Sequence, residues 1–537
     1  MKIVTAAQMR AVEEAFFASG QATVAELMGQ AGRAAADAAL ALLDDPGEVA
    51  ALVLVGPGKN GGDGLVAAEA LYKAGLREVA VWLYRRDGVG EAPVEAGLLD
   101  RVRVVGDGVP FAAALANAGL VVDALFGIGQ RDRLPDDLLA ALKRVDARLR
   151  ELGVRGVAVD IPTGVNADTG AVAELAFRAD ATVTFGRPKR GLYLAPGLRY
   201  TGRVVVAPLG LGEEGVPDDA PRLITRADAA ARLPRREADA HKGTAGSLLI
   251  VGGSANYLGA PVLSAGAALR VGAGLVTLAA PRSLVIALAA QLPEATYLPL
   301  PEAGWGIAGP NAAQTVAEAL GRYTALQLGN GLGREPETEA FLARLFGIAP
   351  RGRNALGFGQ PAAAPATANR EAITMPALID ADGLNWLSTV ERWWEALKGL
   401  RLVLTPHPGE MGRLRGVETH AITADPWTAA RDAARAWGQT VVLKGGHTVV
   451  AAPDGALWVT PTINPALAAA GTGDTLAGEI AGLLTQGLDP TDAAILGLWL
   501  GSRAADLASD ELGTLPLVAS DLPAYLGIAV QELEEGR

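Results

Sequence analysis

The chain of 537 residues contains no cysteine. This absence excludes disulfide bonds, thiolate metal sites and a cysteine nucleophile together. Histidine is scarce as well, and four such residues leave little room for a zinc site. The chemistry of the chain must therefore be sought in other residue types.

Basic residues are too few to balance the acidic ones. The chain has 47 Lys and Arg residues against 59 Asp and Glu residues, so its formal net charge is -12. Because neutralising nucleic-acid phosphates requires a basic face, this charge disfavours nonspecific binding to nucleic acid. We expect no nucleic-acid partner, although a single nucleotide can still bind at a local site.

Long uninterrupted hydrophobic runs are also missing, although 50% of the residues are hydrophobic. The uncharged stretch from Leu248 to Leu269 is interrupted by Gly, Ser, Asn and Pro, which argues against a membrane span. Near the N-terminus, Arg10, Glu13 and Glu14 stand where a signal peptide would need an apolar core. We therefore expect no membrane partner, no export signal and a cytoplasmic protein.

Aromatic residues make up 5% of the chain, and eight of the nine tryptophans follow residue 300. Such a distribution could serve carbohydrate stacking, but core packing is the better explanation. Trp393 and Trp394 cannot both face inward on one helix, so one of them is a candidate subunit contact. We expect a homo-oligomer.

The length of the chain predicts two domains, because 537 residues exceed one ordinary core. In the first half, apolar runs such as 50–55 alternate with helical patterns, which predicts a parallel sheet covered by helices on both faces. A segment rich in charge, Gly and Pro at 212–221 marks the boundary. The apolar runs after it predict a second, mostly parallel α/β sheet with active loops at its strand ends. We expect domains at 1–215 and 222–537, and an exposed Ala- and Pro-rich loop at 350–370.

The segment AGTGDTLAGEIAGLL, from Ala470 to Leu484, joins a glycine turn, a carboxylate and the start of an apolar helix. Backbone N–H groups of Gly471 to Gly473 would bind a developing phosphate charge at the helix N-terminus. Asp474 would lie beside that charge as a base for a substrate hydroxyl. The alternative is an ordinary helix N-cap, a position that Asp and Gly also favour. The other motifs of the chain decide between these two interpretations.

Six further motifs lie beside apolar runs in the second half. They are HKGTAG at His241, GGSANYLGA at Gly252, LGNGLG at Leu328, LIDADGLN at Leu378, LTPHPGE at Leu404 and LKGGHT at Leu443. In this order they resemble the ribokinase-like ADP/ATP-dependent NAD(P)H-hydrate dehydratases, from about His241 to the C-terminal region. The resemblance implies a ribokinase-like α/β domain that releases water from a hydrated nicotinamide cofactor.

Three motifs in the first half resemble the NAD(P)H-hydrate epimerase domain. They are GPGKNGGDG at Gly56, VVDALFGIG at Val121 and VAVDIPTGVNADTG at Val157. This resemblance implies a Rossmann-like three-layer domain. Together the two halves resemble the bifunctional NAD(P)H-hydrate repair enzymes over nearly the whole chain.

For the second domain, the resemblance implies a nucleotide site and a substrate site that meet near Asp474. The nucleotide would be held by Lys444, Gly445, Gly446, His447, Thr448 and Gly473. The hydrated cofactor would contact Ala260, Gly331, Gly333, His407 and Asp474. Sugar kinases of the same superfamily tend to carry Asn where the dehydratases, like this chain, carry His407.

Several residues of the second domain have a second explanation. The KGGHT segment would also suit a surface hairpin turn, and Glu410, which would hold magnesium through water, could simply be solvated. Asp380 and Asp382 look like a metal pair, but we favour a helix cap for Asp380 and leave Asp382 open. The family usually has Pro where this chain has Asn330, a departure that concerns loop rigidity more than chemistry.

The implied dehydration avoids hydroxide as a leaving group, because phosphate leaves far more easily. Asp474 would take the proton of the ring hydroxyl, and the hydroxyl would attack the terminal phosphate of ADP. The ring nitrogen would then help to expel the new phosphate. The products would be NAD(P)H, AMP and phosphate, with magnesium neutralising the developing charge, and we favour ADP over ATP as the co-substrate.

For the first domain, the resemblance implies epimerisation of the R and S hydrates of NADH and NADPH, with Asp160 as the catalytic group for proton transfer and a substrate contact. The other substrate contacts lie in two glycine-containing segments: Lys59, Asn60, Gly61, Gly62, Asp63, Gly127, Ile128, Gly129, Gln130, Arg131, Asp132 and Arg133. The second segment would close over the cofactor. Asn60, Asp123 and Thr163 offer hard oxygen ligands for potassium.

Three positions of the first domain carry alternatives. GPGKNGGDG could be a tight strand-to-helix turn capped by Asn60 and Asp63. Lys59, where the family often has Asn, could face solvent or touch phosphate, and Lys189 could bind phosphate or lie in an exposed loop. Two rival functions also exist: a vitamin or sugar-alcohol kinase on the same fold, and a nonenzymatic binding module in the first domain. His407 and the epimerase motifs argue against the kinase, and Asp123 and Asp160 argue against the module.

Overall fold

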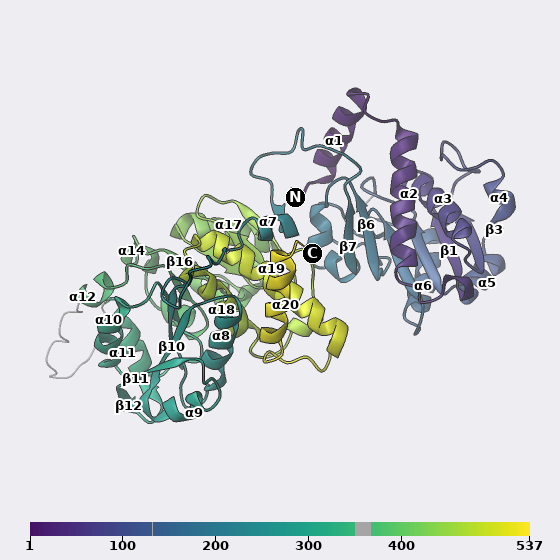
Figure 1. Ribbon diagram of the computed structural model, residues 1–537. Helices are drawn as coiled ribbons and strands as arrows, with labels where there is room; N and C mark the ends of the chain where they lie inside the picture. The colour runs from purple at the N-terminus through teal and green to yellow at the C-terminus, as the bar shows by residue number, and fades with distance from the viewer. Residues whose placement is uncertain (131–132, 349–366, 537) are drawn as a thin grey trace. The chain divides into compact units, whose positions relative to one another are not determined.

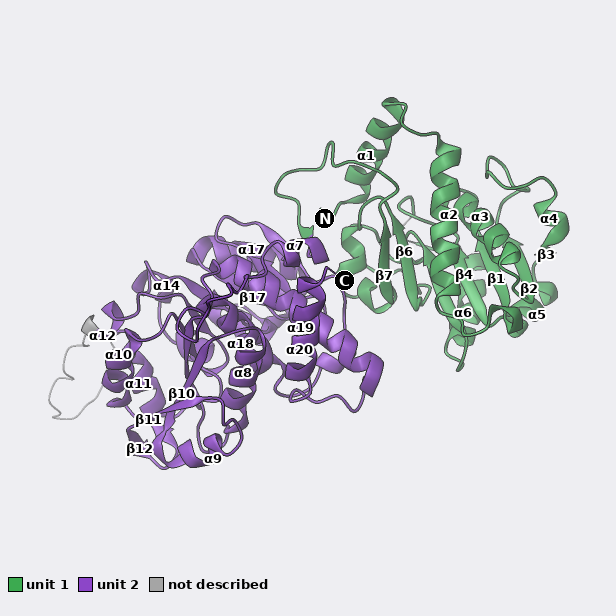
Figure 2. Ribbon diagram, viewed as in Figure 1, with its two compact units in different colours: residues 1–222 green, residues 223–537 purple. Residues whose placement is uncertain are grey.

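The computed structural model describes residues 1–130, 133–348 and 367–536 (Figure 1). Within them the chain forms two compact units, Met1–Arg222 and Leu223–Arg537 (Figure 2). The domain limits expected from sequence, 1–215 and 222–537, stay a prediction about function. Two expected substrate contacts, Arg131 and Asp132, and nearly all of the expected loop at 350–370 lie outside the described residues.

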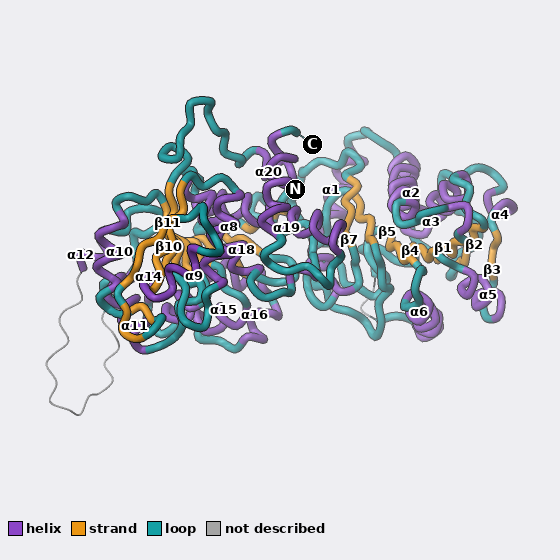
Figure 3. Tube along the Cα trace, turned by 60° about the horizontal axis from the view of Figure 1, so that its bottom comes forward, coloured by secondary structure: helices purple, strands orange, loops and turns teal. Residues whose placement is uncertain are grey.

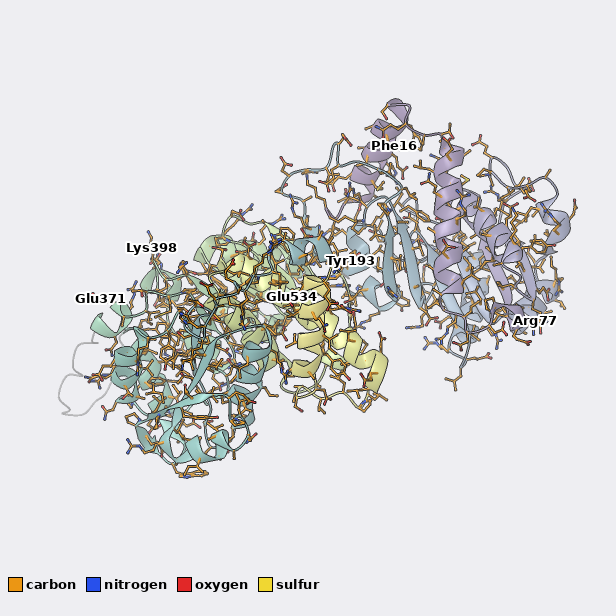
Figure 4. The ribbon with its side chains drawn as sticks, viewed as in Figure 1. Phe16, Arg77, Tyr193, Glu371, Lys398 and Glu534 are labelled. Carbon is orange, nitrogen blue, oxygen red and sulfur yellow. The ribbon has the colours of Figure 1, made fainter. Side chains whose placement is uncertain are left out.

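Unit 1 begins with two helices, α1 (Ala6–Ala18) and α2 (Val24–Leu40). Each starts at a capping box, in which the hydroxyl of Thr5 or Thr23 accepts from a backbone N–H three residues on. The helices that follow are α3 (Lys59–Lys73), α4 (Leu98–Arg101), α5 (Val109–Asn117) and α6 (Asp136–Leu149). Figure 4 shows the side chains of this unit as sticks, including Phe16 on α1.

The sheet of unit 1 has seven strands in the order β3-β2-β1-β4-β5-β6-β7, and neighbouring strands in this order pair in parallel. The strands are β1 (Ala50–Val55), β2 (Glu78–Leu83), β3 (Arg103–Val105), β4 (Leu120–Ala124), β5 (Arg155–Val159), β6 (Ala181–Phe185) and β7 (Arg203–Ala207). The order reverses between β1 and β4. Ligands of open α/β sheets bind in the crevice at such a reversal.

The sheet of unit 1 is covered on both faces, which explains its uniformly apolar strands. Along β1, Val53 and Val55 join the core formed with α2 and α3, whereas Leu52 and Leu54 join the core formed with α5 and α6. The predicted Rossmann-like three-layer arrangement is therefore confirmed.

Unit 2 contains a ten-stranded sheet in the order β11-β10-β9-β14-β15-β16-β17-β18-β19-β8. Its strands are β8 (Arg222–Leu223), β9 (Ser247–Val251), β10 (Leu275–Pro281), β11 (Thr296–Leu300), β14 (Ala325–Leu328), β15 (Ala377–Ile379), β16 (Leu402–Leu404), β17 (Thr440–Leu443), β18 (Val449–Ala451) and β19 (Leu457–Val459). Neighbouring strands from β11 to β17 in this order pair in parallel. Strand β18 pairs antiparallel with both β17 and β19. Strands β12 (Glu302–Gly304) and β13 (Ile307–Ala308) form a separate small ribbon.

The helices of unit 2 lie around this sheet, which Figure 3 shows in orange. They are α7 (Arg226–Ala230), α8 (Gly259–Arg270), α9 (Val285–Ala289), α10 (Ala312–Leu320), α11 (Pro336–Leu345), α12 (Thr367–Glu371), α13 (Asp382–Leu387), α14 (Trp393–Ala396), α15 (Pro408–Arg415), α16 (Thr419–Ala424), α17 (Pro426–Trp437), α18 (Thr472–Thr485), α19 (Pro490–Leu512) and α20 (Leu522–Glu534). Among the described helices, none combines the length and the apolar character that spanning a membrane would need. The mostly parallel α/β architecture predicted for this half is confirmed.

Two features of unit 2 bear on its chemistry. The strand order reverses between β9 and β14, so the loops after these strands, which carry the Gly252 and Leu328 motifs, flank a crevice. Helices α8 and α18 approach closely because a Cβ on Gly482 would lie 2.8 Å from the backbone of Ala268. This contact fixes the C-terminal part of α18 against α8, and Ser264 Oγ, which donates to the carbonyl oxygen of Asp474 at 2.8 Å, ties the start of α18 to the same helix.

The packing of Trp393 agrees with the expectation that the tryptophans fill the core rather than stack on carbohydrate. Trp393 is 1% exposed and its ring lies 5.0 Å from that of Trp437, centroid to centroid. Trp394 is only partly buried. The two neighbours therefore face different surroundings, as their positions on one helix require.

Candidate active sites

Asp474 lies in the first turn of α18, where the helix follows Gly471 in a left-handed conformation with φ +92°. A Cβ on Gly471 would lie 2.6 Å from the side chain of Leu263, so only glycine fits this turn. Among the described residues, no side chain caps this helix start. Its first N–H groups are therefore available to an anion. Asp474 is not the helix cap that the alternative interpretation required.

The carboxylate of Asp474 belongs to a hydrogen-bonded chain that starts at Lys444. Lys444 Nζ lies 2.9 Å from Asp380 Oδ1, and Asn330 Nδ2 donates both to Asp380 Oδ2 at 3.0 Å and to Asp474 Oδ1 at 2.7 Å. Gln327 Nε2 donates to Asn330 Oδ1 at 2.8 Å and so fixes the amide orientation. This hydrogen-bonded chain links Lys444 to Asp474 through Asp380 and Asn330.

This hydrogen-bonded chain corrects one expectation. The carboxylate of Asp380 does not cap a helix, because it accepts from Lys444 and Asn330. Asn330 contacts Asp474 directly, so the residue at this position sets contacts of that carboxylate as well as the course of the loop. Asp382, which we left open, accepts from Gly333 N at 2.9 Å and from Arg334 Nε at 3.2 Å.

Burial shapes the charges of this site. It raises the pKa of Asp474, and the hydrogen bond from Asn330 opposes that rise. Burial alone would lower the pKa of the Lys444 ammonium, but the carboxylates of Asp380 and Glu410 outweigh it and raise that pKa. Lys444 is therefore cationic, and Asp474 is a stronger base than an exposed aspartate.

The expected substrate contacts of unit 2 come from neighbouring loops. Gly331 has φ +70°, and a Cβ there would lie 3.1 Å from Cβ of Ala260, so these two positions meet. Gly333 is held by Asp382. His407 is the N-cap of α15, and its Nδ1 accepts from Gly409 N at 3.0 Å, which leaves the proton on Nε2.

Glu410 is 5% exposed, so it is not the solvated side chain of the alternative interpretation. Its Oε2 accepts from His407 N at 2.8 Å. Burial raises the pKa of Glu410 to about 7, although Lys444 opposes the rise. Burial lowers the pKa of His407, and nearby Lys444 lowers it further.

A cavity of about 340 Å³ opens beside the start of α18. Of the expected nucleotide-site residues, five line it: Lys444, Gly445, Gly446, Thr448 and Gly473. His447 does not, since it is buried and its Nδ1 lies 2.8 Å from the carbonyl oxygen of Thr460. The KGGHT segment joins antiparallel β17 and β18, so it is a hairpin connection as well as a wall of the cavity.

Unit 1 has a cavity of about 530 Å³ at the carboxyl ends of its strands. The expected contacts that line it are Lys59, Asn60, Asp63, Gly127, Ile128, Gly129 and Asp160. Arg10, Glu13 and Phe17 of α1 also line it, which the sequence patterns did not indicate. Lys59 Nζ lies 5.8 Å from the ring centroid of Phe17.

Four expected contacts of unit 1 do not line this cavity. Gly61 and Gly62 lie inside α3, where a Cβ on Gly62 would lie 2.5 Å from Sδ of Met28. Gln130 Oε1 accepts from Gly164 N at 2.7 Å, so it ties two loops together. Arg133 is exposed, 3.6 Å from carboxylate oxygens of Asp136 and Glu174.

Asp160 follows β5 with φ +65°, a strained conformation for a residue with a side chain. Its Oδ1 lies 2.7 Å from Lys189 Nζ, and Thr184 Oγ1 donates to the same oxygen at 3.2 Å. Lys189 is 1% exposed and lines the cavity, so it is not a loop lysine in solvent, and a phosphate contact by its ammonium stays a prediction. Gly127 allows close approach, because a Cβ there would lie 2.8 Å from Asp160 Oδ2.

Two other acids share this cavity. Burial raises the pKa of Asp63 well above its usual range, and the nearby carboxylates of Asp160 and Glu13 raise it further. Burial also raises the pKa of Glu13. The cavity thus combines an ion-paired carboxylate with carboxyl groups that hold protons more readily.

Asp123 and Thr163 meet at the ends of β4 and β5. Asp123 accepts from Thr163 N at 2.7 Å, from Thr163 Oγ1 at 2.8 Å and from Leu125 N at 3.2 Å. Asp123 is 0% exposed, and burial raises its pKa to about 6. Asn60 Nδ2 is buried without a hydrogen-bond partner among the described residues.

Comparisons with known proteins agree with this arrangement. A family model described as NAD(P)H-hydrate dehydratase matches residues 248–526, and one described as YjeF-related protein N-terminus matches residues 24–191. The bifunctional NAD(P)H-hydrate repair enzyme Nnr of Moorella thermoacetica is 39% identical over 495 residues, which are 90% of this chain and 88% of that protein. The chain belongs to the bifunctional NAD(P)H-hydrate repair enzymes.

Other members of this repair-enzyme family extend the similarity. The enzyme of the same name from Coxiella burnetii is 34% identical over 533 residues, 97% of this chain and 98% of that protein. Among solved structures, the ADP/ATP-dependent NAD(P)H-hydrate dehydratase from Bacillus subtilis, co-crystallised with ATP and Mg2+, is 28% identical. It covers 58% of this chain and 99% of its own, with a TM-score of 0.47.

In this repair enzyme, sequence patterns gave little indication that some of the residues at the two sites would lie there. Asn330 stands in a recognised motif and Lys189 in none, and both have partners that lie far away in the sequence. Glu13 and Phe17 lie on α1, well before the first motif at Gly56. Glu479, which lines the unit 2 cavity, sits in an otherwise apolar helix pattern, and that placement was the available signal.

Proposed function

We propose that this chain repairs hydrated NADH and NADPH in two steps. Unit 1 interconverts the R and S hydrates, and unit 2 dehydrates the S epimer with ADP as co-substrate, releasing AMP and phosphate. The observation that carries the proposal is the position of Asp474, beside an uncapped helix start and at the end of the chain from Lys444. That arrangement joins a base to a phosphate-binding turn.

The dehydration begins at the ring hydroxyl. Asp474 takes its proton while the hydroxyl oxygen bonds to the terminal phosphorus of ADP, and the bond to AMP breaks. The uncapped N–H groups at Gly473 and the Lys444 ammonium stabilise the negative charge that develops on the phosphate. Phosphate then leaves from the ring carbon, assisted by the ring nitrogen, and loss of a ring proton restores the dihydronicotinamide.

Magnesium fits this site as a partner of the nucleotide. Among the described residues, no group of three or more His, Cys, Asp or Glu side chains could hold a metal by itself. Mg²⁺ in phosphoryl-transfer sites typically binds through one or two carboxylates together with substrate phosphates. We assign Glu410 to this role through water, and the ion, when bound, neutralises phosphate charge.

Potassium fits unit 1 through Asp123, Thr163 and Asn60. The carboxylate of Asp123 is fully buried, and this burial raises its pKa to about 6. Asn60 lines the neighbouring cavity, and its amide oxygen would be the ligand, because the Nδ2 group is a hydrogen-bond donor and does not bind cations. A bound potassium ion would supply the positive charge that keeps Asp123 ionised.

Epimerisation requires proton transfer at the hydrated ring, and we assign this step to Asp160. The ion pair with Lys189 holds Asp160 toward the cavity, at the point where Gly127 admits a ligand. We further propose that the protein acts in the cytoplasm as a homo-oligomer, without nucleic-acid or membrane partners.

The test is to incubate the protein with mixed epimers of hydrated NADH and with ADP or ATP, following NADH and the nucleotide products. We expect NADH formation to require the nucleotide and to match AMP and phosphate release with ADP. Failure to recover NADH with either nucleotide would overturn the proposed function.

A further inference from the structure

The cavity of unit 2 contains a carboxyl group that the proposed reaction does not use. Glu479 lines the cavity together with Lys444 and Gly473, and its side chain belongs to a residue that is only 1% exposed. Its Oε2 is buried and has no hydrogen-bond partner among the described residues. A buried polar atom without a partner is costly, so it invites a ligand that can pair with it.

Helix α18 places this carboxyl group at the far end of the cavity from the phosphate turn. Thr472, Leu476 and Glu479 follow the i, i+4, i+7 spacing of one helix face, and all three line the cavity. Glu479 is six residues beyond Gly473, about 9 Å along the helix axis at 1.5 Å per residue. That distance suits a nucleoside that stretches between its phosphates and its base.

The surroundings of Glu479 suit a flat apolar ring with a polar edge. Leu476, Leu498 and Leu522 contribute apolar surface to the cavity. A Cβ on Gly501 would lie 2.5 Å from Glu479 Oε2, so a larger residue there would displace the carboxyl group. Mostly apolar walls with one placed polar group are typical of small-molecule sites.

Other polar side chains of the cavity wall are already engaged. Ser502 Oγ donates to the carbonyl oxygen of Leu498 at 2.8 Å, and Asn464 Nδ2 donates to Asp506 Oδ1 at 3.1 Å. Thr472 Oγ1 donates to the carbonyl oxygen of Leu467 at 2.9 Å. Glu479 is therefore the side chain best placed to meet the base of a nucleotide.

We infer that Glu479 recognises the adenine base, by pairing its carboxyl group with N1 and the exocyclic 6-amino group. The inference rests on the proposed function, because it assumes that this cavity binds ADP. Burial raises the pKa of Glu479 to about 8, so the group is protonated at neutral pH. Its O–H then donates to N1 while its carbonyl oxygen accepts from the amino group, which satisfies both partners.

The test measures equilibrium binding of ADP and of 1-deaza-ADP, which lacks the N1 acceptor, to the full chain by calorimetry at pH 7. Three variants are compared with the unsubstituted protein: Glu479→Gln, Glu479→Met and Glu479→Leu. Glutamine keeps a donor and an acceptor in the same place, whereas methionine and leucine fill similar space without either. Two apolar variants guard against one that fails to fold.

We expect the unsubstituted protein to bind ADP roughly tenfold or more tightly than 1-deaza-ADP, the scale of a good bidentate base contact. Glu479→Gln should keep this ratio, and the apolar variants should bring it close to one. Equal binding of the two nucleotides by the unsubstituted protein, or an unchanged ratio in a folded apolar variant, would overturn the inference alone. Absence of ADP binding to the unsubstituted protein would overturn the proposed function with it.

Discussion

At the scale of single residues, the amide of Asn330 organises the acids of unit 2. It donates to Asp380 and to Asp474 at once, and Gln327 fixes its orientation. Two carboxylates brought together in a buried site would otherwise repel each other. The amide lies between the two carboxylates and donates to each, with Asp380 beside Lys444 and Asp474 proposed as the base.

Replacing Asp474 by Asn keeps the size of the side chain and removes its basicity. We expect dehydration to fall by roughly two or more orders of magnitude, the usual effect of losing a general base. Epimerisation by unit 1 should be unaffected and serves as the control. NADH recovery by Asp474→Asn at nearly the original rate would show that another group takes the proton.

Replacing Asn330 by Ala should change the pH dependence of dehydration. The hydrogen bond from Asn330 lowers the pKa of Asp474, so its loss raises that pKa. Because the deprotonated carboxylate is the active form, the acid limb of the pH–rate profile should move to higher pH. A profile whose acid limb stays in place, with only its height reduced, would argue against this role of Asn330.

Replacing Asp123 by Ala should separate the two activities. The substitution removes the buried carboxylate that we assign to potassium, so epimerisation should weaken and lose its response to potassium. ADP binding by unit 2 should not change. Equal losses in both units would point to unfolding or to a shared site and would contradict the assignment.

At the scale of elements, α18 contributes residues to both parts of the proposed site of unit 2, the catalytic carboxylate and the nucleotide cavity. Asp474 meets Asn330, whereas Thr472, Leu476 and Glu479 border the nucleotide cavity. The glycines of this helix serve its packing: a Cβ on Gly482 would lie 2.7 Å from the side chain of Val271. Close packing against neighbouring helices holds α18 in place, so one helix can position both the carboxylate of Asp474 and the wall of the nucleotide cavity.

The buried Glu479 should make unit 2 less stable as the pH rises. Its folded pKa of about 8 lies above the ordinary 4.5, so its contribution is intact below about pH 4.5 and is lost as the pH rises through 8. Relative to Glu479→Gln, the free energy of unfolding of unit 2 should fall by a few kcal/mol, to order of magnitude, over this range. Thermal unfolding scans of both proteins without nucleotide measure the difference.

Parallel pH profiles of the two melting temperatures would contradict the burial of an ionisable Glu479. The comparison with glutamine removes the titration of other groups, since both proteins share them.

The sequence predicted the elements better than the contacts between them. Strand runs such as 50–55 and the turn before Asp474 carry local patterns, so their structures followed from periodicity and glycine placement. The pairing of Lys189 with Asp160, or of Asn330 with two acids, depends on which strand ends lie side by side. Sheet order sets those contacts, and no local pattern encodes it.

The same limit explains the expectations that the structure changed. Gly61 and Gly62 belong to a motif with ligand-binding neighbours, but their backbone lies inside α3 and packs against other residues. His447 belongs to the nucleotide motif, but its ring is buried against Thr460. A motif predicts that its residues lie near the site. It does not predict which of them face the cavity and which face the interior.

At the scale of the whole molecule, the cavities that we assign to the two reactions lie in different compact units, each beside its own sheet. A stereospecific dehydratase consumes only one epimer, so the other would accumulate without an epimerase. Joining both units in one chain keeps their amounts equal. We therefore propose that unit 1 supplies the S epimer that unit 2 consumes.

The measurement that tests this proposal most directly supplies the full chain with the R hydrate of NADH alone, together with ADP, and follows NADH, AMP and phosphate at early times. We predict NADH formation faster than spontaneous epimerisation allows, with one AMP and one phosphate for each NADH. The Asp160→Asn variant should consume the S hydrate normally but stall on the R hydrate. Conversion of the R hydrate no faster than spontaneous epimerisation, or NADH formed without AMP, would contradict the account.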